Sequence, residues 1–436
     1  MIKVFDAKSN KKNEILNKNV TMYVCGPTVY NDPHIGNIRP LLTFDVLYRL
    51  MKIQGYNVHY VHNITDIDDK IIERAKQTGL SEMQIANKYS EEYFKLMEVF
   101  NVYIPEIHKV SDEIKDIISF IEKLVENKAA YVVNGDVYFD VRSVKNYGEI
   151  SHNNIEELIN NVRVENDKDK KDPLDFALWK RTDIGLNWQT TWSKGRPGWH
   201  TECVVMINKY LGKKITIHGG GIDLKFPHHE NENAQNYGAN NCSLADNFQY
   251  VGHLTINGQK MSKSLQNVIL AKDLLKQYQP EFIKWFFYQK NYASPIDFSY
   301  EIMNDVVNQY NKIINSINLF KTKYYLNTRI LPESKPTYNQ TFLDILNDDL
   351  NFANAVSFIQ NQIKELNTNI TDTNNERLLK IYQDLIGAFI ILGIHLKDIH
   401  TNDILKEIDA WNFEVQKKNF QKADELRQKL MQKKVL

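Results

Sequence analysis

VTMYVCGPTVYNDPHIGN, residues 20–37, is the stretch from which the fold follows. Its first five residues are β-branched, aromatic or apolar, and the Cys25-Gly26-Pro27 turn after them predicts a strand that ends in a loop. Apolar residues then recur at helical spacing over 39–54, and Gly55 ends that helix. Residues 57–64, NVHYVHNI, alternate like a second strand. Strand, helix and strand in this order predict the βαβ unit of an α/β sheet.

The rest of the N-terminal part mixes helices and strands. We expect a helix over 70–100 and a hairpin over 131–141, whose turn is Asn134-Gly135. A short strand over 214–218, KITIH, returns to the sheet. The region 110–192 therefore reads as an insertion between two halves of the sheet domain.

After residue 298 the strand signals almost disappear. A linker over 331–339, LPESKPTYN, separates long helical patterns. The sequence thus predicts an α/β half followed by an all-α bundle. The four predicted helices cover 300–325, 341–366, 375–396 and 403–434.

Composition excludes several classes of protein. With 436 residues, 42% of them hydrophobic and 25% charged, the chain is long enough for several folded domains. Three cysteines are too few for a disulfide framework, so we expect a reducing, cytoplasmic location. We expect no signal peptide, and the apolar stretch at 385–396 is too short for a membrane span. The formal net charge is zero, so a nucleic-acid partner would need local basic patches.

Pro33-His34-Ile35-Gly36-Asn37 lies between the first strand and the first helix. In an open parallel sheet, ligands bind at the carboxyl ends of strands, and helix N-termini there attract phosphate. A histidine, a glycine that permits close backbone approach and an amide donor suit a nucleotide phosphate. The same four letters, HIGN, also fit an ordinary turn with a solvated histidine.

Lys260-Met261-Ser262-Lys263-Ser264 is the second short motif. Two lysines and two hydroxyl groups in five residues make a cationic clamp that suits a triphosphate. A solvated basic loop is the alternative when the segment is considered alone.

HIGN early in the chain and KMSKS later, around an α/β sheet, resemble the two signature segments of the class I aminoacyl-tRNA synthetases. The resemblance implies a Rossmann-type site that holds ATP with Mg²⁺ between the segments. His34 and Asn37 would contact the phosphates, and Lys260 and Lys263 would stabilise the leaving pyrophosphate. Because an amino-acid carboxylate is already an anion, positioning and charge neutralisation carry the reaction. The usual first segment ends in histidine, whereas Asn37 keeps a donor but cannot become cationic.

Four residues form a candidate metal site: Cys25, Cys203, His228 and Glu232. The i, i+4 spacing places His228 and Glu232 on one face of a helix that we expect to open after Pro227. Two thiolates, an imidazole and a carboxylate suit zinc. Each cysteine alone also fits a small buried core residue. His229 is the main rival of His228, the weaker rivals are His200 and His218, and we take Cys242 as a non-ligand.

Longer stretches are similar to cysteinyl-tRNA synthetases. The resemblance implies that one zinc ion per chain binds the thiolate of L-cysteine and discriminates it from serine, because a thiol ionises near pH 8.5 and sulfur is a soft donor. It places Thr65 and Trp199 at the cysteine. It also places Gly36, Gly220, Gly221, Asp223 and Lys263 at the ATP. The matching stretches are CGPTVYNDPHIGNIRP (from Cys25), NITDIDDK (from Asn63), GRPGWHTEC (from Gly195), HGGGIDLKFPHHENE (from His218) and GQKMSKS (from Gly258).

The resemblance implies activation of L-cysteine to cysteinyl-adenylate and its transfer to the 3′ end of tRNA(Cys), by a monomer. Basic residues of the last helix suit phosphate contacts. The predicted division of the chain is 1–110 and 193–264 for the Rossmann halves, 111–192 for the connective insertion, 265–305 for a stem-contact region and 306–436 for a helical anticodon-binding domain.

Two rival functions stay open. A related ligase passes activated cysteine to a small amino-sugar acceptor and shares the zinc and ATP segments, but it lacks a full anticodon-binding domain. A non-catalytic tRNA-binding paralogue is the second rival. The long helical C-terminal part disfavours the first, and intact His34, Lys260 and Lys263 disfavour the second.

Overall fold

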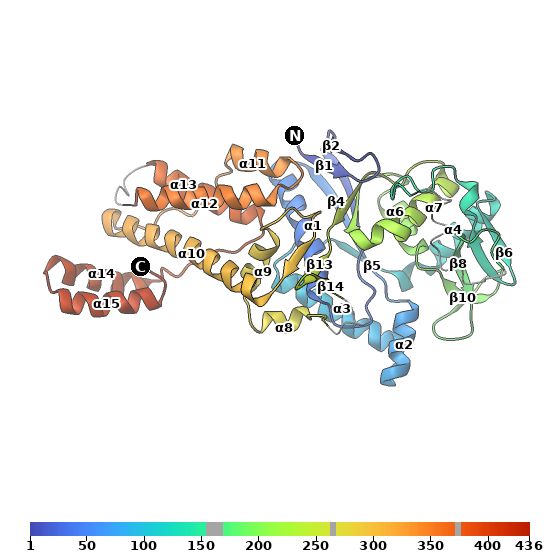
Figure 1. Cartoon of the computed structure of the whole chain (residues 1–436), viewed down its shortest axis with the longest axis horizontal. Coiled ribbons are helices and arrows are strands. Elements are labelled where there is room, and N and C mark those ends of the chain that lie inside the picture. The colour runs from blue at the N-terminus through green and yellow to red at the C-terminus, as the bar shows by residue number, and fades with distance from the viewer. Residues whose placement is uncertain (154–168, 262–266, 371–375) are drawn as a thin grey trace. The chain divides into compact units, whose positions relative to one another are not determined.

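The computed structural model describes residues 1–153, 169–261, 267–370 and 376–436. The chain divides into two compact units. In Figure 1 the strands fall in the blue to yellow part of the chain, and the described part from α10 (Tyr300–Thr328) onwards is helical. Unit 1 contains Met1–Thr255, Gln259–Gln277 and Tyr292–Ile296; unit 2 contains Ile256–Gly258, Tyr278–Asn291 and Asp297–Leu436.

Unit 1 is built on a five-stranded parallel sheet. The predicted βαβ unit is confirmed as β3 (Asn19–Val24), α1 (Ile35–Ile53) and β4 (Asn57–Ile64). With β11 (Ile215–Gly221), β12 (Ala245–Val251) and β5 (Glu106–Lys109), these strands take the order β12-β11-β3-β4-β5. Parallel strands covered on both faces read as near-continuous apolar runs, as β3 does; β4 alternates in sequence, and its C-terminal end also buries the polar side chains of His62 and Asn63.

Helix α1 lies close against the sheet. A Cβ atom at Gly219 of β11 would lie 2.2 Å from the ring of Phe44 in α1, so only glycine permits this approach. Strand β11 therefore carries its glycines where a helix packs on it. The α/β fold class of the N-terminal part is confirmed.

The insertion between β5 and β11 contains a second sheet. It has five antiparallel strands in the order β6-β7-β8-β10-β9. Asn134 and Gly135 both have positive φ, 52° and 93°, which confirms the predicted hairpin turn. The strands are β6 (Ala130–Val133), β7 (Asp136–Phe139), β8 (Phe176–Arg181), β9 (Trp188–Gln189) and β10 (Lys194–Pro197).

The prediction of one helix over 70–100 was wrong in extent. The chain forms α2 (Asp69–Thr78) and α3 (Glu82–Val99) instead. Gly79 ends α2 in the left-handed region with φ 72°, and Ser81 caps α3 by accepting the backbone N–H of Gln84. Glycine at this position stops the helix although the apolar pattern continues.

Unit 2 is helical from α10 onwards, as predicted for the C-terminal part, but two long predicted helices are each split. Residues 341–366 fall into α11 (Gln340–Asn347) and α12 (Phe352–Thr368), and 403–434 into α14 (Asn402–Gln416) and α15 (Phe420–Gln432). Helix α14 packs on α15 around Ile408, Leu430 and Val435. The other helices of this unit are α9 (Pro280–Phe287) and α13 (Glu376–Ile391).

Shorter elements complete the two units. None of the helices in the described ranges is both long and apolar enough to cross a membrane. The remaining elements are β1 (Lys3–Asp6), β2 (Lys11–Glu14), α4 (Ile114–Glu126), α6 (Thr201–Tyr210), α7 (Glu230–Asn240), β13 (Leu254–Ile256), β14 (Gln259–Lys260), α8 (Ala271–Leu275) and β15 (Ile296–Phe298).

Candidate active site

A cavity of about 510 Å³ lies in unit 1 at the carboxyl ends of β3, β4 and β11. This is where an open parallel sheet binds ligands, because the loops that leave neighbouring strands diverge there. Of the residues predicted for the site, those that line it are Cys25, His34, Gly36, Asn37, Thr65, Trp199, Cys203, Gly221, Asp223 and His228. The cavity therefore brings together the HIGN segment and part of the candidate metal site.

The loop after β3 is tied to the end of β4. Gly26 donates its backbone N–H to Oδ1 of Asn63 at 2.8 Å, and a Cβ atom at Gly26 would collide with the Asn63 carbonyl oxygen at 1.7 Å. Asn63 in turn donates to Oγ1 of Thr65 at 3.1 Å. Thr65 is thus held in place, 4% exposed, at the cavity wall where the sequence predicts the cysteine substrate. Sequence reasoning missed this role of Asn63, although the NITDIDDK stretch begins with it.

The HIGN segment begins α1. His34 is the residue before the helix, and its backbone N–H donates to Oδ1 of Asn37 at 2.9 Å. The carboxamide of Asn37 thereby caps the helix and keeps its N–H₂ group as a donor. A Cβ atom at Gly36 would lie 3.0 Å from the His34 ring and 3.3 Å from Met261, which explains the need for a small residue there.

The segment after KMSKS is paired with the HIGN segment. The Ile35 N–H donates to the Ile269 carbonyl at 3.0 Å, and the Ala271 N–H donates to the Pro33 carbonyl at 2.9 Å. Lys272 and Asp32 add an ion pair at 2.8 Å. Two predicted residues cannot be placed in the same way: Lys263 lies outside the described residues, and so does the side chain of Lys260.

Cys25, Cys203, His228 and Glu232 converge from the ends of β3, α6 and α7. The two Sγ atoms are 3.6 Å apart, Sγ of Cys203 is 3.7 Å from Nε2 of His228, and Sγ of Cys25 is 3.7 Å from Oε1 of Glu232. Tetrahedral zinc with the usual bond lengths separates its donor atoms by roughly 3.3–3.8 Å. His228 and Glu232 are closer, at 2.8 Å, because they form an ion pair. The donor set fits a divalent metal ion of the zinc type.

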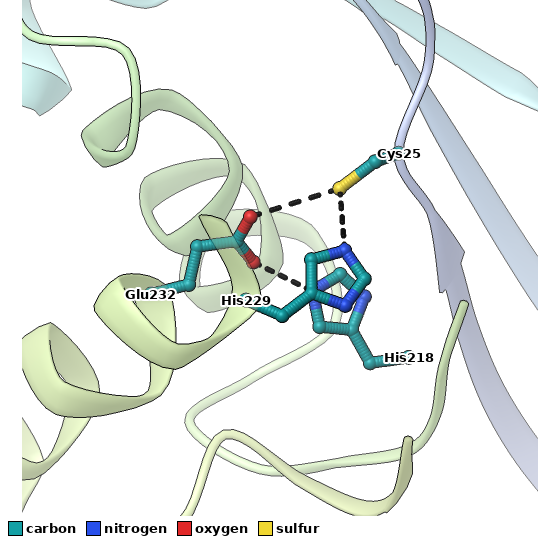
Figure 2. Close-up of side chains that lie close together, drawn as sticks. All are labelled: Cys25, His218, His229 and Glu232. Carbon is teal, nitrogen blue, oxygen red and sulfur yellow. Dashed lines mark hydrogen bonds and ion pairs between the residues drawn. The ribbon is translucent and has the colours of Figure 1, made fainter. Parts of the chain in front are cut away.

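A second set of donors overlaps the first. Cys25, His218, His229 and Glu232 also bring their ligand atoms within 4.8 Å of one another. Figure 2 shows His229 against the Cys25 sulfur, at 3.3 Å, and His218 against the other carboxylate oxygen of Glu232, at 2.6 Å. The remaining nitrogen of His229 lies 3.0 Å from the Tyr250 hydroxyl. The structure therefore places His218 and His229, which the sequence offered as alternative metal ligands, beside the predicted ligands.

Helix α7 starts at Glu230, in agreement with the prediction that a helix opens after Pro227. His228 and His229 lie in the turn before it, and both are buried, as is Glu232. The i, i+4 contact between His228 and Glu232 forms even so, because the turn continues into the helix.

Burial and mutual contacts shift the protonation of the cluster. Burial raises the pKa of Cys25 well above its ordinary value, whereas the hydrogen bond from Cys25 lowers the pKa of Cys203 to about 6. Burial opposes ionisation of Glu232, but His218 and His228 outweigh it and hold the pKa of Glu232 well below its ordinary value. The cluster thus favours a thiolate at Cys203 and a carboxylate at Glu232. These deprotonated forms are the ones that bind a metal cation.

Trp199 borders the cluster on the cavity side, and His200 borders it behind His228. The Trp199 ring lies 4.6 Å from the His228 ring and is 38% exposed. His200 is 2.9 Å from the second nitrogen of His228, which places it behind a predicted ligand. Cys242 contacts the Lys213 carbonyl and Asn236, away from the cluster. Gly220 borders His229 at the same end of β11.

The fold defines the class of the protein: residues 11–308 match the model of the class I (C) tRNA synthetase catalytic domain, and residues 341–397 match the DALR domain. Methionyl-tRNA synthetase of Mycobacterium tuberculosis, solved with methionyl-adenylate, has the same fold, with a TM-score of 0.61 at 11% identity over 91% of each chain.

Curated relatives narrow the class. The cysteine–tRNA ligase of Malacoplasma penetrans is 46% identical over 100% of both chains, and that of Ureaplasma parvum is 43% identical over 99% of both. The chain belongs to the cysteine–tRNA ligase family of class I synthetases.

Proposed function

We propose that the chain activates L-cysteine with ATP and joins it to tRNA(Cys). One observation carries the proposal: the thiol-bearing cluster opens onto the cavity that the HIGN segment borders, so an amino acid held at the cluster lies next to the nucleotide segment. Family membership over the full chain supports the same activity. It also disfavours the amino-sugar ligase, because the DALR domain is present in the helical part.

We propose zinc as the metal and Cys25, Cys203, His228 and Glu232 as its ligands. The first donor set uses both thiols, and thiolates are among the ligands that select zinc. His218 contacts Glu232, as His228 also does, and His229 contacts Cys25 and Tyr250. Such contacts orient the ligands of a metal and fix their protonation. When bound, zinc would supply a borderline-soft Lewis acid that favours the substrate thiolate over a hydroxyl group.

The residues of the chain then bind and orient the reactants. Thr65 and Trp199 border the cysteine, while Gly36, Gly220, Gly221 and Asp223 border the nucleotide. His34, Asn37, Lys260 and Lys263 would neutralise the phosphates, which are bound with Mg²⁺.

Two bond exchanges complete the reaction. A carboxylate oxygen of cysteine attacks the α-phosphorus, and the bond to pyrophosphate breaks. A ribose hydroxyl at the 3′ end of the tRNA next attacks the carbonyl carbon. The bond to AMP breaks, and the hydroxyl proton passes to the AMP phosphate.

The helical part would bind the anticodon region of the tRNA. Helix α15 carries exposed lysines and arginine, such as Lys422, Arg427 and Lys429, which suit phosphate contacts. The five-part division of the chain, the monomeric state and the cytoplasmic location stay predictions from the sequence.

The decisive experiment is charging of total tRNA with labelled cysteine, together with cysteine-dependent exchange of pyrophosphate into ATP. We expect both activities, and we expect both to be lost after chelation and restored by zinc. Exchange without charged tRNA would point to a small-acceptor ligase. If folded, zinc-loaded protein shows neither activity, the non-catalytic tRNA-binding paralogue is the function that remains.

A further inference from the structure

Tyr23 is a buried polar side chain next to the metal cluster to which the proposed function assigns no role. It lies on β3, two residues before Cys25, and is fully buried. Its neighbours belong to α6, where Met206 follows Cys203 by three residues and therefore lies on the same face of the helix. A phenol buried at this place needs a hydrogen-bond partner for its hydroxyl group.

The Tyr23 hydroxyl has two sulfur atoms as partners. It donates to Sδ of Met206 across 3.6 Å. Burial raises the pKa of Tyr23 well above its ordinary value, and its contacts with Cys203, which include a side-chain hydrogen bond, raise the pKa further. The hydroxyl therefore stays protonated and can donate its hydrogen to either sulfur.

The backbone of Tyr23 contacts the other donor set. Nδ1 of His218 lies 3.3 Å from the Tyr23 carbonyl oxygen, and the two rings meet edge to face with their centres 5.6 Å apart. Because a carbonyl oxygen only accepts, this contact holds a proton on Nδ1 of His218 and leaves Nε2 facing Glu232. Tyr23 thus contacts both donor sets, one through its hydroxyl group and the other through its backbone.

The two sulfur atoms differ as acceptors once a metal is bound. A thioether is a weak acceptor, whereas hydrogen bonds to an ionised group are roughly twice as strong as neutral ones. Cys203 has to be a thiolate to bind a metal. Resting on the proposed zinc site, we propose that Tyr23 donates its hydroxyl hydrogen to the Cys203 thiolate and is a positioning residue that sets the strength of this ligand.

This hydrogen bond has a consequence for the binding of cysteine. It withdraws electron density from the Cys203 thiolate, so this ligand gives less of it to the metal, and the site keeps more affinity for the thiolate of the amino acid. The same bond orients the Cys203 sulfur and stabilises its deprotonated form. Tyr23 therefore supports the affinity for zinc and the affinity for cysteine.

Three variants separate this role from packing. Tyr23→Phe removes only the hydroxyl group, and Met206→Leu removes the competing acceptor at nearly constant volume. Tyr56→Phe is the matched control, because it removes another buried hydroxyl, which donates to the Ile15 carbonyl. We expect Tyr23→Phe to weaken zinc binding about tenfold in competition with a chelator, and the other two variants to stay within about twofold of the unsubstituted protein.

Cobalt in place of zinc provides a spectroscopic measurement that a change in packing alone would not move. In Tyr23→Phe the charge-transfer band from sulfur to cobalt should shift to longer wavelength, because a thiolate without this hydrogen bond gives up its electrons more readily. The band should stay in place in Met206→Leu and Tyr56→Phe. In pyrophosphate exchange, Tyr23→Phe should raise KM for cysteine about fivefold, the effect of one lost hydrogen bond, and leave KM for ATP within about twofold.

An unchanged cobalt band together with unchanged zinc affinity in Tyr23→Phe would overturn the inference. An equal loss of zinc affinity in Met206→Leu would overturn it as well, because the hydroxyl would then act through Met206. If the unsubstituted protein neither binds zinc nor exchanges pyrophosphate, the proposed function itself fails, and the inference with it.

Discussion

The metal cluster and the exposed face of α2, which lines a separate cavity together with Tyr30 and Asn31, differ in how their polar groups are satisfied. Cys203, His218, His229 and Glu232 are at most 2% exposed and are joined through contacts with one another or with Cys25 and His228. By contrast, Lys70, Glu73 and Gln77 on α2 are exposed. Polar groups that are buried together are held in one arrangement. Removal of one group leaves its partners without a hydrogen bond, because no water is available in the interior to take its place. Exposed charges keep water as an alternative partner, so they tune binding by smaller amounts. Substitutions in the metal cluster should therefore weaken binding far more than substitutions on α2.

The largest effect should follow removal of Cys203. Cys203→Ala deletes a donor of the first set but leaves Cys25, His218, His229 and Glu232 in place. We expect zinc affinity to fall more than a hundredfold, because loss of a ligand exceeds the ten- to hundredfold effect of losing a group that orients one. Competition with a chelator measures the affinity directly.

His218→Phe is the informative partner of that variant. It removes the bond to Glu232 and should weaken zinc binding by roughly ten- to a hundredfold. Cys242→Ser is the matched control and should leave affinity unchanged, since Cys242 lies away from the cluster. If Cys203→Ala keeps zinc while His218→Phe loses it, the second donor set holds the metal and our ligand proposal is wrong.

An intermediate effect should appear in the pH dependence of stability. Burial lowers the pKa of His62 in the cavity wall to about 4, although its bond to the Val24 carbonyl opposes the shift. Between pH 6.5 and 4 the unfolded chain therefore binds a proton that the folded chain does not. The contribution of neutral His62 to the free energy of unfolding is complete above pH 6.5. It decreases by roughly 2–3 kcal/mol as the pH falls toward 4.

Urea unfolding at pH 7, 6 and 5 checks this contribution. The free energy of unfolding of His62→Phe should change less with pH than that of the unsubstituted protein. His59→Phe, at an exposed histidine paired with Glu106, should change as much as the unsubstituted protein. The same slope in all three proteins would show that His62 does not stay neutral.

The smallest expected effect concerns Asn37, which both caps α1 and faces the cavity. Asn37→Asp keeps the oxygen that accepts the His34 N–H, so unfolding free energy should stay within about 0.5 kcal/mol. The carboxylate repels phosphate and loses the N–H₂ donor, so the rate of exchange should fall about tenfold. Asn37→Ala should lose the cap as well, at a cost of about 1 kcal/mol. Unchanged exchange in Asn37→Asp would remove Asn37 from the proposed phosphate site.

Local patterns predicted elements well where a turn residue coincides with the end of an apolar period. The hairpin at Asn134-Gly135 and the βαβ unit through Gly55 are examples. They failed where a helix stops while the apolar pattern continues, either at a glycine, as at Gly79 between α2 and α3, or without any turn residue. The break between α14 and α15 falls at Lys417–Asn419, although these residues include no glycine or proline. Packing of Ile408 against Leu430 and Val435 folds this segment back, and that contact is not visible in a periodicity.

The sequence by itself determined the α/β class of the N-terminal part, the family and the kinds of residue available to the site, because periodicity, turn residues and motif letters are local properties. Only the tertiary structure decided which donors meet. Strands β11 and β3 are neighbours in the sheet, so Cys25 at the end of one lies beside the histidines that follow the other. The overlap of two donor sets through Cys25 and Glu232, and the cavity on α2, follow from that arrangement of the backbone in space rather than from spacing along the chain.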